Sequence, residues 1–205
     1  MATSARNLIL ANAITLATTL VFGGDVGWLL WPYWVQSVII GWYARKRMLA
    51  LRVFSTEGFT SNNRPVPENE QGKRSTANFF VLHYGFFHAG YLVFLLAQHR
   101  VDGWLGITAL AASGVSFVMS QRQTYAAQHA ADLRGKPNLG ALMFTPYLRV
   151  LPMHLGILMG GALGGDGAML WVFTALKTAS DIGLDAVDRR IAERSAARAA
   201  AVNRR

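Results

Sequence analysis

Basic residues are sorted between the gaps that separate six apolar stretches of this chain. The even-numbered gaps and the chain ends hold nearly all of the 20 Lys and Arg residues, whereas the alternate gaps contain Arg100 as their only cation. Each alternate gap carries one acid instead, Asp25, Asp102 or Asp166. Cytoplasmic loops of multi-pass membrane proteins retain Lys and Arg during insertion, and a soluble domain has no comparable reason to sort its charges. The pattern therefore predicts a polytopic membrane protein.

Each stretch has about the length needed to cross a membrane. A crossing takes about 20 apolar residues, with a range of roughly 17 to 25. Six spans with cationic even-numbered gaps place both termini in the cytoplasm. We therefore expect an all-α bundle of six transmembrane helices over residues 1–188, in the inner membrane of a bacterium, and a basic cytoplasmic tail over residues 189–205. The expected spans are Asn7–Gly23, Trp28–Ala44, Ala77–Ala97, Trp104–Ser120, Pro146–Gly164 and Ala168–Leu184.

Two long cytoplasmic loops are expected, at residues 52–76 and 121–145. Residues 55–76 have no apolar periodicity, which predicts a flexible linker. Residues 121–138 are polar and rich in alanine, so we expect them to extend the fourth helix until Gly135 and Pro137 end it.

Composition narrows the classes of partner. The chain is 52% hydrophobic and 15% charged, whereas about a quarter of the residues of a soluble domain are charged. The net charge of +9 is compatible with nucleic-acid binding, but the cations flank apolar segments. The expected anionic partner is therefore the lipid headgroup layer of the bilayer, and no nucleic-acid partner is expected. The chain has no cysteine, which excludes disulfides, thiolate nucleophiles and cysteine-ligated metals.

Ionisable residues within the expected spans are the best indicators of function, because each costs about 2.5–3.5 kcal/mol to insert. The expected site combines His83, His154 and Asp181 on the cytoplasmic half of the bilayer. Neutral imidazoles with a carboxylate suit a divalent transition metal, and imidazoles alone suit haem. Further polar residues are expected around this site, namely Gln36, Tyr84, His88, Tyr147, Arg149 and Lys177.

Helical geometry limits which histidines can share a ligand. His83 and His88 are five residues apart, which separates them by about 140° around a helix. A metal would therefore need one of them together with His154 and Asp181. The alternative is that each histidine hydrogen-bonds a neighbouring helix. Lys177 and Asp181, four residues apart, predict either an ion pair within one helix or a path for protons or cations.

Three other functions are compatible with these residues. Transport of a small solute or proton through the polar cluster is one, and a membrane scaffold held together by polar contacts is another. The third is a rhomboid-like intramembrane protease with Ser113 and His154 as its catalytic pair. Against it, Ala111 stands where such proteases carry glycine, and the two residues lie on spans that run in opposite directions. Whether the chain is an enzyme stays open.

A glycine ridge on the fifth span offers a surface for close helix packing. Gly156, Gly160 and Gly164 repeat every fourth residue, as in small-xxx-small helix contacts. The ridge predicts either packing within the chain or a homo-oligomer.

Four motifs occur in order along most of the chain, Tyr33-Trp34-Val35-Gln36-Ser37, His83-Tyr84-Gly85, Pro146-Tyr147-Leu148-Arg149-Val150 with His154, and Lys177-Thr178 with Asp181. By their order and spacing the chain resembles an uncharacterised bacterial family of multi-pass membrane proteins, a domain of unknown function. The resemblance implies a polytopic membrane architecture and brings no activity with it. Where relatives carry Glu-Asn, this chain has Gln36-Ser37, which weakens a metal or proton role at that position.

Overall fold

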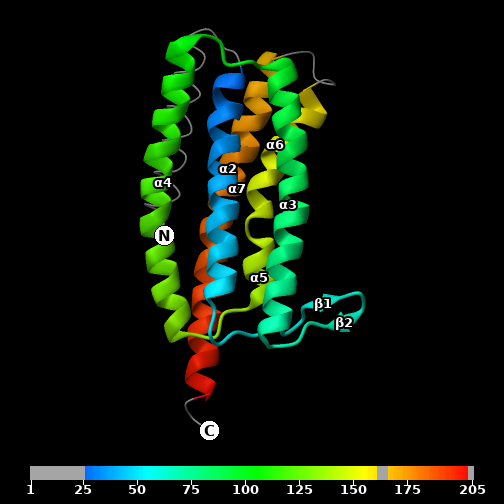
Figure 1. The fold of residues 1–205 in the computed structure, drawn as a ribbon, viewed down its shortest axis with the longest axis vertical. Coiled ribbons are helices and arrows are strands. Elements are labelled where there is room, and N and C mark those ends of the chain that lie inside the picture. The colour runs from blue at the N-terminus through cyan, green and yellow to red at the C-terminus, as the bar shows by residue number, and fades with distance from the viewer. Residues whose placement is uncertain (1–25, 161–165, 203–205) are drawn as a thin grey trace.

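The chain folds into a bundle of near-parallel helices with one small β-hairpin (Figure 1). A computed structural model describes residues 26–160 and 166–202. The expected first span, Asn7–Gly23, lies outside the described residues. The elements are α2 (Gly27–Ala50), β1 (Thr60–Ser61), β2 (Arg64–Pro65), α3 (Glu70–Gln98), α4 (Gly103–Arg134), α5 (Leu139–Phe144), α6 (Tyr147–Gly160) and α7 (Asp166–Val202).

The helical fold class is confirmed, and α2, α3, α4 and α7 contain the second, third, fourth and sixth expected stretches, while α6 contains the described part of the fifth from Tyr147 onwards. The predicted extension of the fourth helix is also confirmed, since α4 continues to Arg134. The expected tail continues α7 as helix to Val202. Of the described helices, α3 and α4 are the two that are long and apolar enough to cross a membrane. The structure therefore does not by itself support six spans, and that number stays a prediction.

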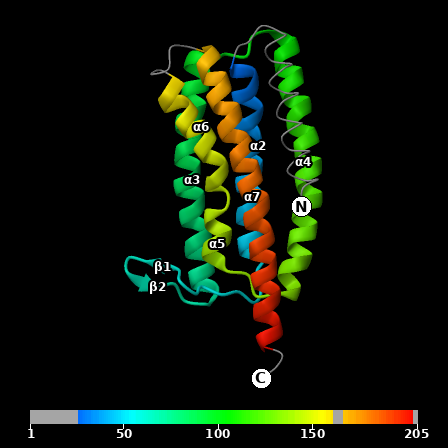
Figure 2. The same cartoon turned by 180° about the vertical axis from the view of Figure 1, so that it is seen from behind.

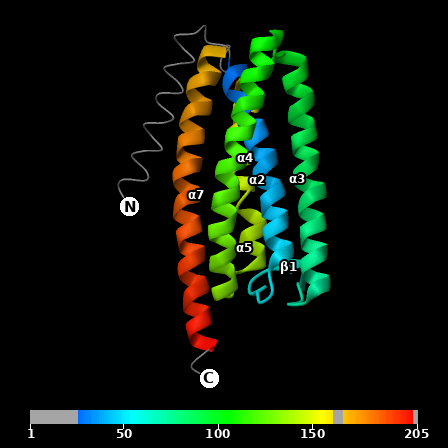
Figure 3. The same ribbon diagram turned by 60° about the vertical axis from the view of Figure 1, so that its left-hand side comes forward.

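Helix α2 lies at the centre of the bundle. It packs against α3, α4, α5 and α6, while α7 packs along α6 and also touches α4 (Figures 1 and 3). The approach of α3 to α2 depends on Gly41, because the ring of Tyr84 occupies the space that a Cβ at this position would need. The Tyr84 hydroxyl donates a hydrogen bond to the Ser37 carbonyl at 3.0 Å. Large side chains fill the interior between the helices, among them Leu30, Tyr33, Phe80, Leu95, Met153 and Phe173.

The sorting of charge along the sequence becomes an asymmetry between the two ends of the bundle. Helices α2 and α4 end, and α3 and α5 begin, at the end that carries β1 and β2, here called the hairpin end (Figure 2). Cations gather there in the described part of the chain, including Arg47, Arg52, Arg74, Arg134 and Lys136. At the opposite end, Arg100 is the one cation of the described residues, between α3 and α4.

The apolar side chains of α3 and α4 mostly point away from the bundle. Only 28% of the most apolar window of α3 is buried, and only 6% of that of α4. Leu82 is 77% exposed, Phe86 74%, Trp104 79% and Leu105 82%. A core helix of a soluble protein would bury such residues, because each buried large apolar side chain stabilises the fold by about 1.5–3 kcal/mol. Exposure on this scale favours lipid around these two helices.

The prediction of a flexible linker at residues 55–76 is wrong. Thr60 pairs with Pro65 and Ser61 with Arg64 in an antiparallel hairpin. The turn residues Asn62 and Asn63 have φ of 51° and 59°, the left-handed conformation that two-residue hairpin turns require and that asparagine tolerates. Helix α3 then begins at Glu70, where the side chain of Asn69 accepts a hydrogen bond from the Gly72 amide at 2.9 Å.

The segment that carries the hairpin is fixed to the α4–α5 connection. The Ser55 amide donates to the Pro137 carbonyl at 2.8 Å, and the Leu139 amide donates to the Ser55 carbonyl at 2.8 Å. This pairing forms a parallel bridge between Ser55 and Asn138. Nearby, the Glu68 carboxylate accepts hydrogen bonds from the Lys136 ammonium at 2.9 Å and from the Thr56 amide at 3.0 Å. Two connections that are distant in the sequence therefore hold each other in place.

Candidate functional site

An ion cluster lies between the start of α6 and the middle of α7. The Asp181 carboxylate is 6% exposed and binds the Lys177 ammonium at 2.7 Å on the same helix. A guanidinium nitrogen of Arg149, on α6, is 3.7 Å from the other Asp181 oxygen. The predicted pairing of Lys177 with Asp181 within one helix is thus confirmed. Two cations on two helices therefore surround a largely buried carboxylate, as a buried ion cluster requires.

Backbone carbonyls of α6 tie this cluster to its neighbours. The Tyr33 hydroxyl, from α2, donates to the Arg149 carbonyl at 2.5 Å. The Lys177 ammonium lies 5.7 Å from the centre of the Tyr33 ring, within the range of a cation–π contact. Ser180 on α7 donates to the Leu148 carbonyl. Three helices therefore meet at the cluster.

The three predicted ligands His83, His154 and Asp181 do not converge on one point. His83 Nδ1 shares a hydrogen bond with the Tyr147 hydroxyl at 2.9 Å, and His154 Nδ1 shares one with the Tyr91 hydroxyl at 3.0 Å. Asp181 pairs with cations instead. Within residues 26–160 and 166–202, no three His, Asp or Glu side chains are placed to hold a metal ion. His83 is level with Tyr147 and His154 with Tyr91, which follows His83 on α3 by about 12 Å at 1.5 Å per residue, so the two imidazoles differ in depth along the bundle.

The two imidazoles that were expected to suit haem share one aromatic neighbour. The Phe87 ring contacts both imidazoles, with ring centres 5.1 Å from His83 and 6.1 Å from His154. The imidazoles thus pack on the same aromatic ring and each hydrogen-bonds a tyrosine of another helix. This is the interhelical role that was the alternative interpretation.

The separation of His83 and His88 on α3 is as the helical spacing predicted. His83 is exposed, whereas His88 is buried against Tyr84. His88 Nδ1–H donates to the Tyr84 carbonyl at 2.8 Å, and Nε2 has no hydrogen-bond partner among the described residues. Gln36, on α2, is half-buried and makes no side-chain hydrogen bond within the described part of the chain. Gln36 is therefore not part of the ion cluster.

The protease pair is not assembled. Ser113 lies on α4, which packs against α2 and α7, while His154 lies on α6 with its Nδ1 hydrogen-bonded to Tyr91. No hydrogen bond joins Ser113 to His154 in the structure as described.

The glycine ridge packs within the chain at the one position where its surroundings are described. A Cβ at Gly156 would contact the Phe173 ring of α7 at 3.3 Å. Gly164 lies outside the described residues. A homo-oligomer through this ridge therefore gains no support from Gly156.

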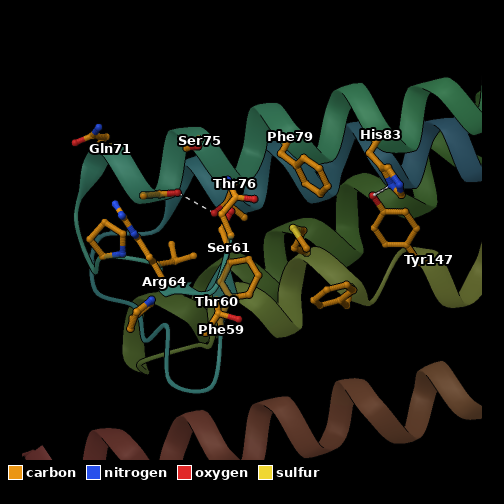
Figure 4. Close-up of a pocket in the computed structure, with 17 residues that line it drawn as sticks. Phe59, Thr60, Ser61, Arg64, Gln71, Ser75, Thr76, Phe79, His83 and Tyr147 are labelled. Carbon is orange, nitrogen blue, oxygen red and sulfur yellow. Dashed lines mark hydrogen bonds between the residues drawn. The ribbon is translucent and has the colours of Figure 1, made fainter.

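A groove of about 910 Å³ lies on the outer side of α3 at the hairpin end (Figure 4). Helix α3 forms one wall, the hairpin another, and α5 with the start of α6 the third. Along α3 the groove extends from Gln71 to His83, which is about 18 Å at 1.5 Å per residue. Two predicted site residues, His83 and Tyr147, form its inner end, where they hydrogen-bond each other.

The two ends of the groove differ in chemistry. Towards the hairpin its lining is polar, with hydroxyls from Thr60 and Ser61 and the guanidinium of Arg64. Arg64 has no carboxylate within ion-pair distance among the described residues. Towards the middle of the bundle the lining is aromatic and apolar, from Phe59, Phe79, Met143, Phe144 and Tyr147. Sequence patterns gave no signal for this site, because its walls come from three separate segments.

Comparisons with known proteins place nearly all of the described region in one family. A family model described as a family of unknown function matches residues 2–198. No curated protein and no solved structure matches the chain.

Proposed function

The chain belongs to the family of unknown function DUF6498, and we propose that it is a polytopic inner-membrane protein whose groove binds an anionic phospholipid of the cytoplasmic leaflet. The observation that carries this proposal is the groove itself. It is polar and cationic at the hairpin end, and it becomes aromatic where α3 turns apolar.

The bilayer is supported by two independent features. The apolar windows of α3 and α4 are mostly exposed, which is unfavourable in water and neutral in lipid. Cations gather at the hairpin end, as expected of the cytoplasmic ends of membrane helices. We propose six spans with both termini in the cytoplasm, in the plasma membrane of a bacterium, so that the hairpin end faces the cytoplasm.

The absence of cysteine from the chain makes this topology directly testable. Asn62→Cys places a thiol in the hairpin turn, and Asp102→Cys places one between α3 and α4 at the opposite end. In intact cells we expect a membrane-impermeant maleimide to label Asp102→Cys and to leave Asn62→Cys unlabelled until the membrane is opened. Labelling of Asn62→Cys from outside would overturn the orientation.

The groove is continuous with the lipid-facing side of α3. Phe79 lines the groove and is 53% exposed, and Leu82 and Phe86 follow it on the same helix face, since residues three, four and seven apart share one side of a helix. An acyl chain lying against α3 can therefore enter the aromatic end of the groove from the bilayer without crossing water.

The positive charge at the polar end of the groove favours a lipid with an anionic headgroup. Arg64 stands at the polar end with its guanidinium free of carboxylates in the described part of the chain, and no acidic side chain lines the groove. A guanidinium pairs with a phosphate through two parallel hydrogen bonds, which makes arginine well suited to phosphate recognition. The neighbouring hydroxyls of Thr60 and Ser61 add neutral donors. An anionic phospholipid such as phosphatidylglycerol matches both ends of the groove.

Lipid binding is measured on the full-length protein in detergent by native mass spectrometry, with phosphatidylglycerol and phosphatidylcholine of identical acyl chains. We expect phosphatidylglycerol to bind more tightly, and Arg64→Gln to weaken it about tenfold, the loss of one charge-assisted hydrogen bond. Arg52→Gln is the matched control, because Arg52 is an exposed cation at the same end and does not line the groove. Phe79→Ala should weaken binding of both lipids.

Two results would contradict the proposal. One is equal binding of the two lipids by the wild-type protein. The other is equal loss in Arg64→Gln and Arg52→Gln, which would indicate general attraction to the basic end of the bundle. Absence of any retained lipid would favour a scaffold, in which the polar residues only hold the helices together.

A further inference from the structure

A second, smaller cavity lies inside the bundle at the hairpin end. Its volume is about 90 Å³, and it is bordered by α2, α4, α7, α5 and the start of α6. Its polar lining consists of Tyr43, Arg47, Gln121, Thr124, Gln128, Thr145 and Arg149. No carboxylate lines it. The cavity shares no lining residue with the groove.

Arg149 has hydrogen-bond donors without acceptors. Its guanidinium makes no hydrogen bond among the described residues, and its closest carboxylate oxygen, on Asp181, is 3.7 Å away. The second Asp181 oxygen is bound to Lys177 at 2.7 Å. The Arg149 side chain is only 27% exposed. A guanidinium carries five N–H donors, and those of Arg149 have no acceptor among the described residues while remaining partly accessible, so they are available to an acceptor in the cavity.

The opposite wall holds a second arginine in a fixed position. Arg47 donates from Nε and Nη2 to the two Asp132 oxygens, at 2.6 and 2.8 Å. Its charge is therefore balanced, but its plane is held rigidly at the edge of the cavity. Tyr43, Gln121 and Gln128 supply neutral hydroxyl and amide donors, whereas the Thr124 hydroxyl already donates to the Ser120 carbonyl at 3.2 Å.

We propose that this cavity binds a small inorganic oxyanion, phosphate or sulfate, with the Arg149 guanidinium as its main ligand. The tetrahedral oxyanion accepts hydrogen bonds from Arg149 on α6 and from the hydroxyl and amide side chains of α2 and α4. Cavities that take drug-sized ligands begin at about 300 Å³, so 90 Å³ admits an ion of this size and excludes a nucleotide or an acyl chain. The bound ion would add a further link between α2, α4 and α6, beside the Arg47–Asp132 ion pair and the hydrogen bond from Tyr33 to the Arg149 carbonyl.

The test is thermal unfolding of the full-length protein in a zwitterionic detergent, titrated with sodium sulfate or sodium phosphate. Sodium chloride at equal ionic strength is the reference. Sulfate and phosphate stabilise most proteins through exclusion from the surface, an effect that grows steadily with concentration. Specific binding adds a second contribution to the stabilisation. Once the anion concentration exceeds the dissociation constant, this contribution grows with the logarithm of that concentration. We expect this second component in the wild type, and a shift of at least tenfold to higher concentration in Arg149→Gln.

Matched variants separate the site from general effects of charge. Arg122→Gln removes an exposed cation from α4 that does not line the cavity, and it should keep the wild-type response. The double variant Gln121→Leu with Gln128→Leu removes neutral donors from the cavity wall and should also weaken anion binding. It replaces Arg149→Gln as the test if that variant does not fold. Phosphatidylglycerol added to the detergent micelles should not displace the ion. Arg64→Gln should leave the affinity for the ion unchanged. Both results separate this site from the lipid groove.

The proposal is overturned if stabilisation by sulfate and phosphate shows only the steady exclusion effect. It is also overturned if Arg149→Gln and the double glutamine variant respond as the wild type does. In either case water, rather than an anion, satisfies the Arg149 donors.

Discussion

Arg47 on α2 and Asp132 on α4 form a two-point ion pair that joins the hairpin ends of these helices. The Nε and Nη2 atoms of Arg47 lie 2.6 and 2.8 Å from the two carboxylate oxygens, and the side chains are 12% and 6% exposed. The residues are 85 positions apart in the sequence. The pair fixes both the register and the rotation of α4 relative to α2, because a guanidinium and a carboxylate match in only one planar arrangement.

Removing one partner of this pair should destabilise the bundle strongly. We expect Asp132→Ala to lower the free energy of unfolding by about 3 kcal/mol, because it leaves the Arg47 charge largely buried without a carboxylate. The apolar double variant Arg47→Met with Asp132→Leu should lose less unfolding free energy than Asp132→Ala alone, because it leaves no buried charge without a partner. Unfolding by sodium dodecyl sulfate, followed by far-ultraviolet circular dichroism, measures both. Equal stability of Asp132→Ala and the wild type would show that the pair contributes nothing.

Gly72 should not tolerate a side chain, although it lies within a helix. A Cβ at this position would overlap the carbonyl oxygen of Pro67, a backbone atom that cannot turn away. We expect Gly72→Ala to cost about 1–3 kcal/mol and to weaken lipid binding, since Gly72 and Pro67 both line the groove. Gly85→Ala is the control, because no atom lies within 4 Å of its Cβ. That variant should be neutral or up to about 1 kcal/mol more stable. Similar behaviour of both variants would show that the backbone at Pro67 does not restrict this position.

The Glu68 contact makes part of the stability of the hairpin segment dependent on pH. The hydrogen bond from the Lys136 ammonium, followed by that from the Thr56 amide, holds the pKa of Glu68 below its ordinary value. A lowered pKa in the folded state means that the stabilisation is complete above the unfolded value of about 4.3 and is lost as the pH falls through the folded value. Because Glu68 is 43% exposed, the effect should be below about 1 kcal/mol.

Thermal unfolding of the wild type and of Glu68→Gln between pH 3 and 7, a range set by the ordinary pKa of about 4.3, tests this contact. We expect the wild type to be more stable above the ordinary Glu pKa, and the two curves to converge at the acid end. Curves that stay parallel throughout would show that the carboxylate makes no net contribution to folding.

The hydrogen bond between Tyr91 and His154 should behave as an ordinary contact between two helices. We expect Tyr91→Phe to cost about 0.6 kcal/mol, the average for such contacts in membrane proteins. A metal chelator should leave the melting temperature of the wild type unchanged, because the His154 Nδ1 atom is engaged in a hydrogen bond with the Tyr91 hydroxyl. A chelator-induced decrease that disappears in His154→Ala would restore the metal interpretation.

The sequence predicts well those features that depend on one segment. Apolar runs located the helices, and the alanine-rich polar segment after Ser120 indicated that α4 continues to Arg134. The spacing of Lys177 and Asp181 placed them in contact, because residues four apart share a helix face. The angular separation of His83 and His88 also follows from one helix alone. The basic residues that the sequence sorts into alternate gaps gather at the hairpin end of the bundle in the described part of the chain.

Features that need two segments were missed or predicted wrongly. The contact between Arg47 and Asp132 depends on how α4 is rotated against α2, which no local pattern encodes. His83 and His154 were expected to lie at one depth and share a ligand, but each hydrogen-bonds a tyrosine of the other helix, at a different level of the bundle. The hairpin did leave a local signal in Asn62-Asn63, a pair that tolerates the left-handed turn. The groove left no local signal in the sequence, because its walls form only when α3, α5 and the hairpin come together.

The parallel bridge between Ser55 and Asn138 has a consequence for how this protein matures during synthesis. The ribosome makes residue 55 first and reaches residue 138 only after α3 and α4 have been translated, several seconds later at about 5–20 residues per second. Until then the hairpin segment lacks its anchoring partner. A nascent chain arrested before residue 138 should therefore expose this segment to cytoplasmic proteases, whereas one arrested beyond α5 should protect it.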